Sequence, residues 1–381
     1  MNKEFYSGLK LGVLGGGQLG RMLIQAAIDL NVYIKVLDPS AEAPCKAYAH
    51  EFVQGSLQDF DTVVAFGQDV DILTIEIEKV NTDALAELQA QGKKVYPDPS
   101  IIKLIQSKCA QKQYYLDQGL PTSPFRLIEN AAAIQDHLDM LPAVQKLDRD
   151  GYDGKGVQVL KTEADLPKAM DAPGLLEAFV PFEKEIAIII ARNEKGEIKT
   201  FPIVEMVFHP VHNLVEYLFS PAEVSQAQFE EAESIAKRLV EGLDFVGLLA
   251  IEMFVGKDGE ILINEIAPRP HNSGHQSIRG NLTSQYEQHL RAILGLPLGD
   301  TDILSPSAMV NLLGADGYKG KAVYKGIEDL LGIGGAYPHL YGKAETKPFR
   351  KMGHVTILAK DLEQLQEKVK QVKESVEVIS E

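Results

Sequence analysis

The chain has 381 residues, of which 54 are acidic and 38 basic, giving a formal net charge of −16, and 45% of its residues are hydrophobic. This charge excludes broad nucleic-acid binding, because a phosphate backbone requires a basic surface. The length predicts two or three domains of an ordinary globular protein. No apolar run is long enough to cross a bilayer, no N-terminal signal pattern is present, and there are only two cysteines. We therefore expect no membrane association and a reducing, cytoplasmic setting.

The first hundred residues predict a parallel α/β domain. Apolar runs that read as strands alternate with helical patterns, and glycines follow the first strand, as in a βαβ unit. The expected strands lie at 9–14, 33–37, 71–77 and 94–96, and the expected helices at 21–30, 60–66 and 81–91.

The rest of the chain predicts mixed α+β structure. A helix at 103–118 is followed by a small unit with strands at 143–146 and 157–160 around a glycine-rich turn. Beyond residue 175 strands dominate, at 186–191, 200–207, 248–255 and 260–266, with helices at 222–241 and 362–374.

A glycine loop follows the first strand. Gly15, Gly17 and Gly20 form G-x-G-x-x-G, and Asp38 lies near the position of a ribose-binding acid. This pattern fits an NAD-dependent dehydrogenase, but any helix N-terminus with close-approach glycines can bind a phosphate. Glycines needed only for helix–strand packing are a further alternative.

Two glutamates are predicted to face each other on a hairpin. Apolar runs flank Asp258-Gly259, a favoured two-residue turn, and that turn would place Glu252 directly opposite Glu265. Like charges about 5 Å apart across a sheet are destabilising unless a proton or a cation lies between them. Carboxylate oxygens suit Mg²⁺, so we expect a metal site here; the alternative is that both side chains face solvent.

A glycine-rich hairpin and a lysine indicate a triphosphate site. Lys146 ends a strand, and Gly151 to Gly156 follow with Lys155 at the centre of the turn. The segment is no Walker A loop, because glycine follows the lysine and a strand comes next. Such a hairpin can fold over phosphates as a lid, although a plain exposed hairpin is the alternative.

Two later segments carry donors for a substrate. The loop Pro268-Arg269-Pro270-His271-Asn272-Ser273-Gly274-His275 follows the carboxylate pair. His271 and His275 are four residues apart, but no third zinc ligand lies near them in sequence, which favours substrate binding. Lys343, Lys347, Arg350 and Lys351 form a basic cluster that suits a phosphate group on the acceptor, unless it is only a solvated turn.

Taken in order, these residues resemble those of the N5-carboxyaminoimidazole ribonucleotide synthetase family of ATP-grasp ligases. The resemblance covers nearly the whole chain, and the segments His271–His275 and Arg350–His354 are its most specific parts. The residues that carry it are Gly15 to Met22, Glu76, Glu78, Lys108, Lys146, Gly151 to Gly156, Glu177, Glu185, Glu252, Asn264, Glu265, Pro268 to His275, and Arg350 to His354.

The resemblance implies an ATP-grasp fold in three parts. These are an N-terminal Rossmann-like domain at 1–105, a small lid domain at 106–180, and a C-terminal mixed-sheet domain at 181–381 that ends in a basic β subdomain. It also implies that ATP phosphorylates bicarbonate to carboxyphosphate, which carboxylates the amine of 5-aminoimidazole ribonucleotide. Mg²⁺, for which Mn²⁺ could substitute, would be the metal, and the family usually forms homodimers.

Site residues follow from the same resemblance. Glu252 and Glu265 would hold the metal, and Arg269, Asp153 and Lys351 would take part in catalysis. ATP would be held by Lys108, Lys146, Gly151, Tyr152, Asp153, Gly154, Lys155, Gly156, Val157, Glu177, Val180, Glu185, Asn264 and Glu265. The acceptor would be held by Gly17, Gln18, Leu19, Glu76, Tyr152, Asp153, His271, Asn272, Ser273, Lys343, Arg350 and Lys351.

The chain departs from the family pattern at several positions. Lys108 stands where arginine is common, Phe208 where histidine is usual, and Ala267 where many ATP-grasp enzymes have an asparagine ligand. Besides the dehydrogenase, two alternatives stay open: a formate-dependent glycinamide ribonucleotide ligase, and an inactive regulatory ATP-binding protein.

Overall fold

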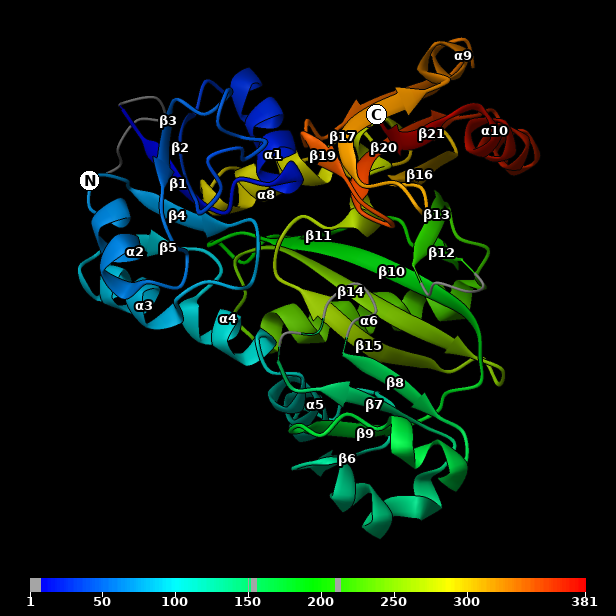
Figure 1. The fold of residues 1–381 in the computed structure, drawn as a ribbon. Coiled ribbons are helices and arrows are strands. Elements are labelled where there is room, and N and C mark those ends of the chain that lie inside the picture. Colours follow the sequence, from blue (N-terminus) through cyan, green and yellow to red (C-terminus); the bar gives the residue numbers. More distant parts are fainter. Residues whose placement is uncertain (1–7, 150, 152–155, 210–213) are drawn as a thin grey trace.

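The computed structural model describes residues 8–149, 151, 156–209 and 214–381. In this part of the chain three larger sheets are arranged around a central junction, and a small sheet lies near the C-terminus (Figure 1). No helix in the described ranges is long and apolar enough to span a membrane.

The N-terminal sheet is parallel, as expected, with strand order β3-β2-β1-β4-β5. The side chains of α1 and of a later helix, α8 (Gln285–Ile293), pack against one face, whereas those of α2, α3 and α4 pack against the other. The predicted strands and helices are confirmed, and β3 was not predicted. The elements are β1 (Lys10–Leu14), α1 (Gln18–Asp29), β2 (Tyr33–Asp38), β3 (Glu51–Gln54), α2 (Phe60–Gly67), β4 (Ile72–Ile75), α3 (Thr82–Ala90), β5 (Lys94–Val95) and α4 (Pro99–Ile105).

The single helix predicted at 103–118 is wrong, because the chain forms two helices there. Asp98 caps α4, which begins at Pro99, and Ser107 caps the second helix, α5 (Lys108–Asp117), by accepting the N–H of Ala110. A serine in this position favours starting a new helix over continuing the old one.

The lid sheet is antiparallel with order β6-β9-β7-β8. The two strands predicted here are confirmed as β7 and β8, which pair with Lys146 opposite Val157. Two 3₁₀ helices were not predicted. The elements are β6 (Phe125–Ile128), a 3₁₀ helix (Ala131–Met140), β7 (Ala143–Leu147), β8 (Val157–Leu160), a 3₁₀ helix (Glu163–Lys168) and β9 (Gly174–Ala178).

The large sheet is antiparallel, with order β15-β14-β10-β12-β13-β16-β20-β18 and β11 paired to β10. The helix α6 packs its apolar side on β10, β14 and β15. The elements up to the carboxylate hairpin are β10 (Phe182–Arg192), β11 (Ile198–Thr200), β12 (Val204–Phe208), β13 (Val215–Ser220), α6 (Gln226–Gly242), β14 (Gly247–Gly256) and β15 (Ile261–Ala267).

Two boundaries in this region differ from prediction. The strand expected at 200–207 is broken at Pro202, which has no N–H to donate to a ladder, so that β11 ends at Thr200 and β12 begins at Val204. The helix expected from 222 begins at Gln226, because Ser225 and Gln228 form a capping box.

The C-terminal part completes the large sheet and adds a sheet of order β19-β17-β21. The predicted last helix is confirmed as α10, whereas α8, capped by Ser284, was missed. The elements are a 3₁₀ helix (Asn272–Gly274), α7 (Ser277–Gly280), α8 (Gln285–Ile293), β16 (Ser307–Leu313), β17 (Gly320–Lys325), α9 (Ile327–Leu331), β18 (Ala336–Leu340), β19 (Glu345–Thr346), β20 (Lys351–Leu358), α10 (Leu362–Ser375) and β21 (Glu377–Ser380).

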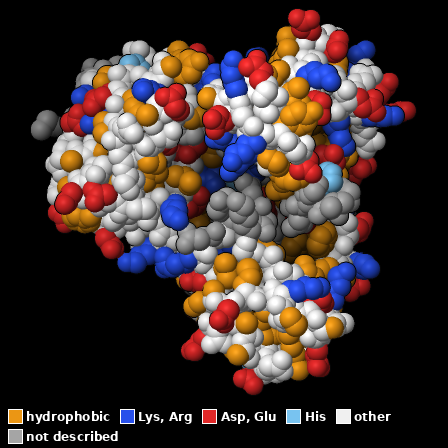
Figure 2. Space-filling view, viewed as in Figure 1, with side chains coloured by type: hydrophobic (Ala, Val, Ile, Leu, Met, Phe, Trp, Pro, Cys, Tyr) orange, Lys and Arg blue, Asp and Glu red, His pale blue; other side chains and the backbone are white. Residues whose placement is uncertain are grey.

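The space-filling view shows a hollow in the middle of one face, where the N-terminal, lid and C-terminal parts meet (Figure 2). Lysine and arginine side chains gather around this hollow although the chain as a whole is acidic. Local positive charge of this kind favours an anionic ligand.

Candidate active site

Glu252 and Glu265 pair across the hairpin as predicted, but the loop and the strand register that bring them together differ from the prediction. Gly256 donates its N–H to the Glu260 carbonyl, so the loop contains three residues, 257–259, and not the predicted two. That turn alone would set Glu252 opposite Asn264. Asn264 is instead an extra residue in a β-bulge, and the bulge restores the pairing of Glu252 with Glu265.

Charge differs sharply between the two glutamates. Lys108 lies 2.5 Å from Glu265 and holds the pKa of that carboxyl well below its usual value. Burial, reinforced by the Glu265 and Glu185 carboxylates, raises the pKa of Glu252. Glu185 lies on β10 on the same sheet face as Glu252, and burial raises its pKa to about 7. Three carboxylates thus share one face of the sheet.

Next to these carboxylates lies a lysine network. Lys146 Nζ lies 3.0 Å from Glu177 Oε2 and donates a hydrogen bond of 2.8 Å to Asn264. Lys112 Nζ, which sequence reasoning missed, lies 3.0 Å from the other oxygen of Glu177. Burial alone would raise the pKa of Glu177, but Lys146 and Lys112 outweigh it and lower the pKa. The network joins α5 and the lid sheet to β15.

Only part of the glycine-rich turn is described. Gly156 has φ +74°, which favours glycine, and its carbonyl accepts the N–H of Leu147 at the base of the β7–β8 hairpin. Gly151 and Val157 lie at the same base, and Val180 lies in the turn before β10. The predicted site residues Tyr152, Asp153, Gly154 and Lys155 lie outside the described residues.

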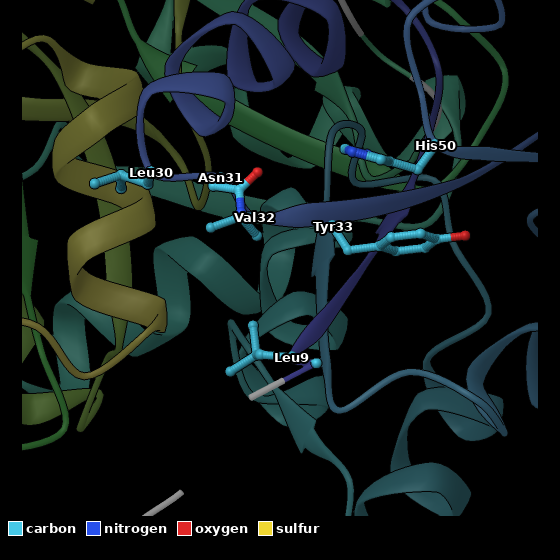
Figure 3. Close-up of a pocket in the computed structure, with 7 residues that line it drawn as sticks. Leu9, Leu30, Asn31, Val32, Tyr33 and His50 are labelled. Atoms are coloured by element: carbon cyan, nitrogen blue, oxygen red, sulfur yellow. The ribbon is translucent and has the colours of Figure 1, made fainter. Parts of the chain in front are cut away.

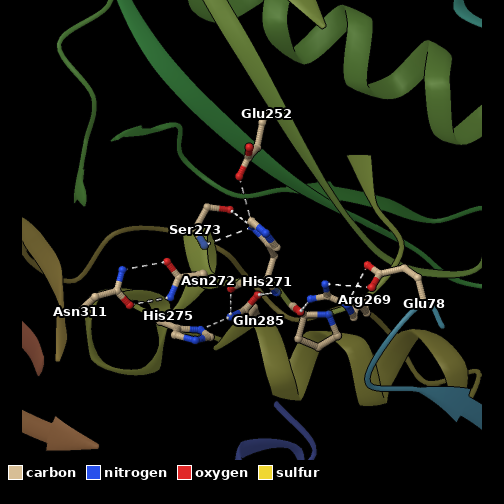
Figure 4. Close-up of polar contacts among 10 residues, drawn as sticks. Glu78, Glu252, Arg269, His271, Asn272, Ser273, His275, Gln285 and Asn311 are labelled. Atoms are coloured by element: carbon tan, nitrogen blue, oxygen red, sulfur yellow. Dashed lines mark hydrogen bonds and ion pairs between the residues drawn. The ribbon is translucent and has the colours of Figure 1, made fainter. Parts of the chain in front are cut away.

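The donor loop after β15 reaches the carboxylates. His271 Nδ1 lies 3.7 Å from Glu252 Oε1, and the two side chains point toward each other (Figure 4). Asn272 and Ser273 follow in the same loop: the Asn272 amide exchanges hydrogen bonds with Asn311, and Ser273 Oγ lies 2.9 Å from His271 Nδ1.

His275 does not join His271 in a metal site. Its Nδ1 lies within hydrogen-bonding distance of Gln285 and Tyr286, and its ring is buried against His354. No group of three His, Cys, Asp or Glu side chains that could hold a metal occurs in the described ranges. The arrangement therefore gives no support to a zinc site.

Arg269 is turned toward Glu78, which follows β4 of the N-terminal sheet (Figure 4). Its Nε lies 2.8 Å from Glu78 Oε1, and its Nη2 donates to Glu78 Oε2 over 3.1 Å. The guanidinium is therefore already paired with a carboxylate, which the sequence did not reveal because 191 residues separate the two.

The glycine loop is occupied by the chain's own carboxylates. Glu76 Oε1 accepts the N–H of Leu19 near the start of α1, next to Gln18, and a Cβ at Gly17 would lie 2.5 Å from it. Asp38 accepts the N–H of Gly16 over 2.7 Å. Two N–H groups expected to bind a dinucleotide, those of Gly16 and Leu19, are thus used internally, which speaks against the dehydrogenase alternative.

The basic cluster is partly assembled at β20. Lys343 Nζ donates to the Lys351 carbonyl over 2.7 Å, and Arg350 is the residue before the strand. The charge of Lys351 acts on Glu252, which links this cluster to the carboxylates.

Two further residues of the region, Asn311 and Lys112, were missed in the sequence. Asn311 carries no local signal. Lys112 did carry one, because it lies one helical turn after Lys108 and so shares its face of α5.

Two cavities in the described part of the chain lie away from these residues. One, of about 220 Å³, is lined by Leu9, Leu30, Tyr33, His50 and neighbouring residues at the start of β1 and β2 (Figure 3). None of the described residues that line it is a lysine, an arginine or an acidic residue. The other, of about 200 Å³, lies between α1 and β18. Neither cavity contains a residue that the sequence assigned to the site.

Three protein-family models match successive parts of the chain. A ribonucleotide synthetase preATP-grasp domain matches residues 9–106, an ATP-grasp domain residues 113–286, and a phosphoribosylaminoimidazole carboxylase C-terminal domain residues 307–368. The fold, the matches and the carboxylate–lysine cluster define an ATP-grasp enzyme.

Individual relatives narrow this class. The N5-carboxyaminoimidazole ribonucleotide synthase of Synechococcus elongatus is 41% identical over 91% of this chain and 89% of its own. The crystal structure of N5-carboxyaminoimidazole ribonucleotide synthetase from Thermotoga maritima has a TM-score of 0.91 and 40% identity, covering 98% of this chain and 100% of that one.

A third relative shows what such a fold can hold. The Aspergillus clavatus N5-carboxyaminoimidazole synthase, solved with ADP and 5-aminoimidazole ribonucleotide, has a TM-score of 0.87 and 33% identity over 97% of this chain and 98% of that one. The chain belongs to the N5-carboxyaminoimidazole ribonucleotide synthase family of ATP-dependent ligases.

Proposed function

We propose that this chain carboxylates the exocyclic amine of 5-aminoimidazole ribonucleotide with bicarbonate, at the expense of ATP. The products are N5-carboxyaminoimidazole ribonucleotide, ADP and phosphate, within purine biosynthesis. The observation that carries the proposal is the Glu252–Glu265 pair, with Lys108 and Lys146 on one side and His271 on the other. This arrangement offers negative charge for a cation and positive charge for phosphates within one site.

The first step forms carboxyphosphate. A bicarbonate oxygen attacks the γ-phosphorus of ATP, and the bond to the β-phosphate oxygen breaks. Lys108 and Lys146 would neutralise phosphate charge there, and Gly151, Gly156 and Val157 would position the hairpin over it. Glu177, Val180, Glu185 and Asn264 complete the proposed nucleotide site, together with Tyr152, Asp153, Gly154 and Lys155 outside the described residues.

The second step joins carbon to nitrogen. The amine attacks the carbonyl carbon of carboxyphosphate, or the CO₂ released from it; phosphate leaves, and the nitrogen loses a proton. Arg269 would hold the oxyanion during this transfer, and Asp153 would bind the amine. Lys343, Arg350 and Lys351 would bind the ribonucleotide phosphate, while His271, Asn272, Ser273, Glu76 and the 17–19 backbone would orient the rest.

The donor set fits Mg²⁺, which is usually held by one or two carboxylates with phosphate and water. Glu252 and Glu265 would supply those carboxylates, and the metal would balance charge on the ATP phosphates. Mn²⁺ should substitute. Binding of Mn²⁺ in the presence of ADP, followed by electron paramagnetic resonance, should weaken in Glu252→Gln.

Phosphate release from ATP and Mg²⁺ tests the function. Bicarbonate and 5-aminoimidazole ribonucleotide are added singly and together, and we expect strong stimulation that requires the ribonucleotide. Glu265→Gln should abolish it, whereas Glu260→Gln, an exposed glutamate on the same hairpin, should leave it unchanged. Stimulation by formate and glycinamide ribonucleotide instead would keep the fold and overturn the acceptor.

We also propose a division into units at 1–105, 106–180 and 181–381, a cytoplasmic location and a homodimer. The three separate sheets support the division, and the two free cysteines agree with a reducing compartment. Sedimentation velocity should give the mass of a pair of chains.

A further inference from the structure

A carboxylate from the N-terminal part of the chain holds the arginine of the proposed transfer step. Glu78 follows β4, and Arg269 follows β15, so the contact joins the first sheet to the large sheet. Both side chains are largely buried, with 24% and 16% of their surface exposed. Burying a guanidinium requires a partner for its charge, and Glu78 supplies it.

The contact with Glu78 involves the side-on edge of the Arg269 guanidinium and does not involve its end-on edge. At the side-on edge, Nη2 donates to one oxygen of Glu78, and Nε lies at an ion-pair distance of 2.8 Å from the other. Nη1 donates to the carbonyl of Pro270 over 3.1 Å. Arginine has five N–H groups in a rigid fork. The contacts among the described residues use one N–H of Nη1 and one of Nη2, which leaves a second N–H on each of these two nitrogens of the end-on edge. That edge has the geometry to bind a second oxyanion.

The backbone around Arg269 limits its movement. Pro268 and Pro270 flank it and restrict the main chain on both sides. A second carboxylate, that of Glu76, also acts on its charge. Without Glu78, the guanidinium would be drawn toward Glu76 and the start of α1, away from its present direction.

We infer that Glu78 is a positioning residue, which holds the side-on edge of Arg269 so that the end-on edge binds the oxyanion of the transfer step. This inference rests on the function proposed above. It assigns to the N-terminal sheet a part in the transfer step, exercised through Arg269 and not by direct contact with the reacting atoms.

Glu78→Gln tests the inference. The amide keeps the size of the side chain and one acceptor oxygen, but it loses the charge and places an NH₂ group against the guanidinium. We expect kcat for ribonucleotide-dependent phosphate release to fall about 10- to 100-fold, the range for misplacing a group that acts on a transition state. KM for ATP should change less than twofold. Glu78→Asp, which keeps the charge but is shorter by one methylene, should lie between.

A double-mutant cycle separates positioning from general stability. If Glu78 acts through Arg269, Glu78→Gln should add little to the loss caused by Arg269→Lys. A matched control is Glu194→Gln, which weakens the exposed pair with Lys94, 2.7 Å apart, also between the first sheet and the β10–β11 turn. It should leave kcat unchanged.

The outcomes are distinct. A parent protein without ribonucleotide-dependent activity would overturn the proposed function itself. An active parent with a Glu78→Gln kcat within twofold of normal would overturn the inference alone. Multiplicative losses in the double variant, or a Glu78→Gln effect accounted for by a lower unfolding midpoint, would do the same.

Discussion

Lys112 and Glu177 are charged, yet each has only 3% of its surface exposed. Lys112 donates to Thr122 over 2.5 Å and to Ser123 over 3.0 Å, and its Nζ lies 3.0 Å from Glu177 Oε1 as an ion pair. A buried ion pair of this kind contributes little net stability, but breaking it leaves a buried charge without compensation. The Lys112–Glu177 ion pair fixes the position of the Glu177 carboxylate relative to Lys146.

Lys112→Met should therefore destabilise the protein by about 3–5 kcal/mol, because Glu177 loses one of its two lysines. The double variant Lys112→Met/Glu177→Gln should lose less than the sum of the single variants. Urea unfolding measures both. Lys103→Met removes an exposed pair with Asp83 and should change stability by less than about 1 kcal/mol. Strictly additive losses would contradict the coupling.

At this scale, local patterns predicted some contacts and could not predict others. Glu252 and Glu265 lie on one hairpin, where a period of two and a short turn limit the possible pairs. Glu78 and Arg269, by contrast, meet only because two separate sheets pack together. A single sequence carries no periodic signal for such a contact, so the pairing of Arg269 with Glu78 was not predicted, and the place of Arg269 in the site stays a prediction.

At the scale of elements, the prediction of the β14–β15 hairpin contains two errors whose effects on the strand register cancel. The loop is one residue longer than predicted, which shifts the register by one, and the bulge at Asn264 shifts it back. Side-chain direction alternates along a strand, so either change alone would have turned Glu265 to the other face. The bulge also sets Asn264 where its side chain accepts from Lys146.

The glycine loop and α1 give a prediction at this scale. In Gly17→Ala the new Cβ would lie 2.5 Å from Glu76 Oε1, so the carboxylate must leave the N–H of Leu19. We expect a loss of about 1–3 kcal/mol, measured by urea unfolding. Gly334→Ala is the matched control, because nothing in the described part of the chain beyond its sequence neighbours lies within 4 Å of its Cβ, and its φ is not positive. Equal effects of the two substitutions would show that Glu76 does not fill the loop.

Over the whole molecule, the first sheet is joined to the rest by a few specific contacts and an apolar layer. α1 packs against α8 through residues such as Leu23 and Leu290. Beneath this layer Thr74 of β4 lies 3.0 Å from His289 of α8, with both side chains fully buried. Sequence patterns predicted the separate sheets, but the joint depends on α8, whose short helical pattern was missed.

Acid should weaken this joint. Burial lowers the pKa of His289 to about 3, below its ordinary value of 6.5. Between these values the unfolded chain binds a proton that the folded chain does not, so stability is complete above about pH 6.5 and falls as the pH drops toward 3. The loss from one such histidine is about 1.4 kcal/mol per pH unit.

His289→Gln keeps a partner for Thr74 and cannot titrate, so its unfolding free energy should fall less steeply between pH 6 and 4. Thr74→Ala should lose about 1 kcal/mol at pH 7 yet retain the parent slope. Urea unfolding across this pH range measures both, and equal slopes in His289→Gln and the parent would show that His289 takes up a proton in the folded state.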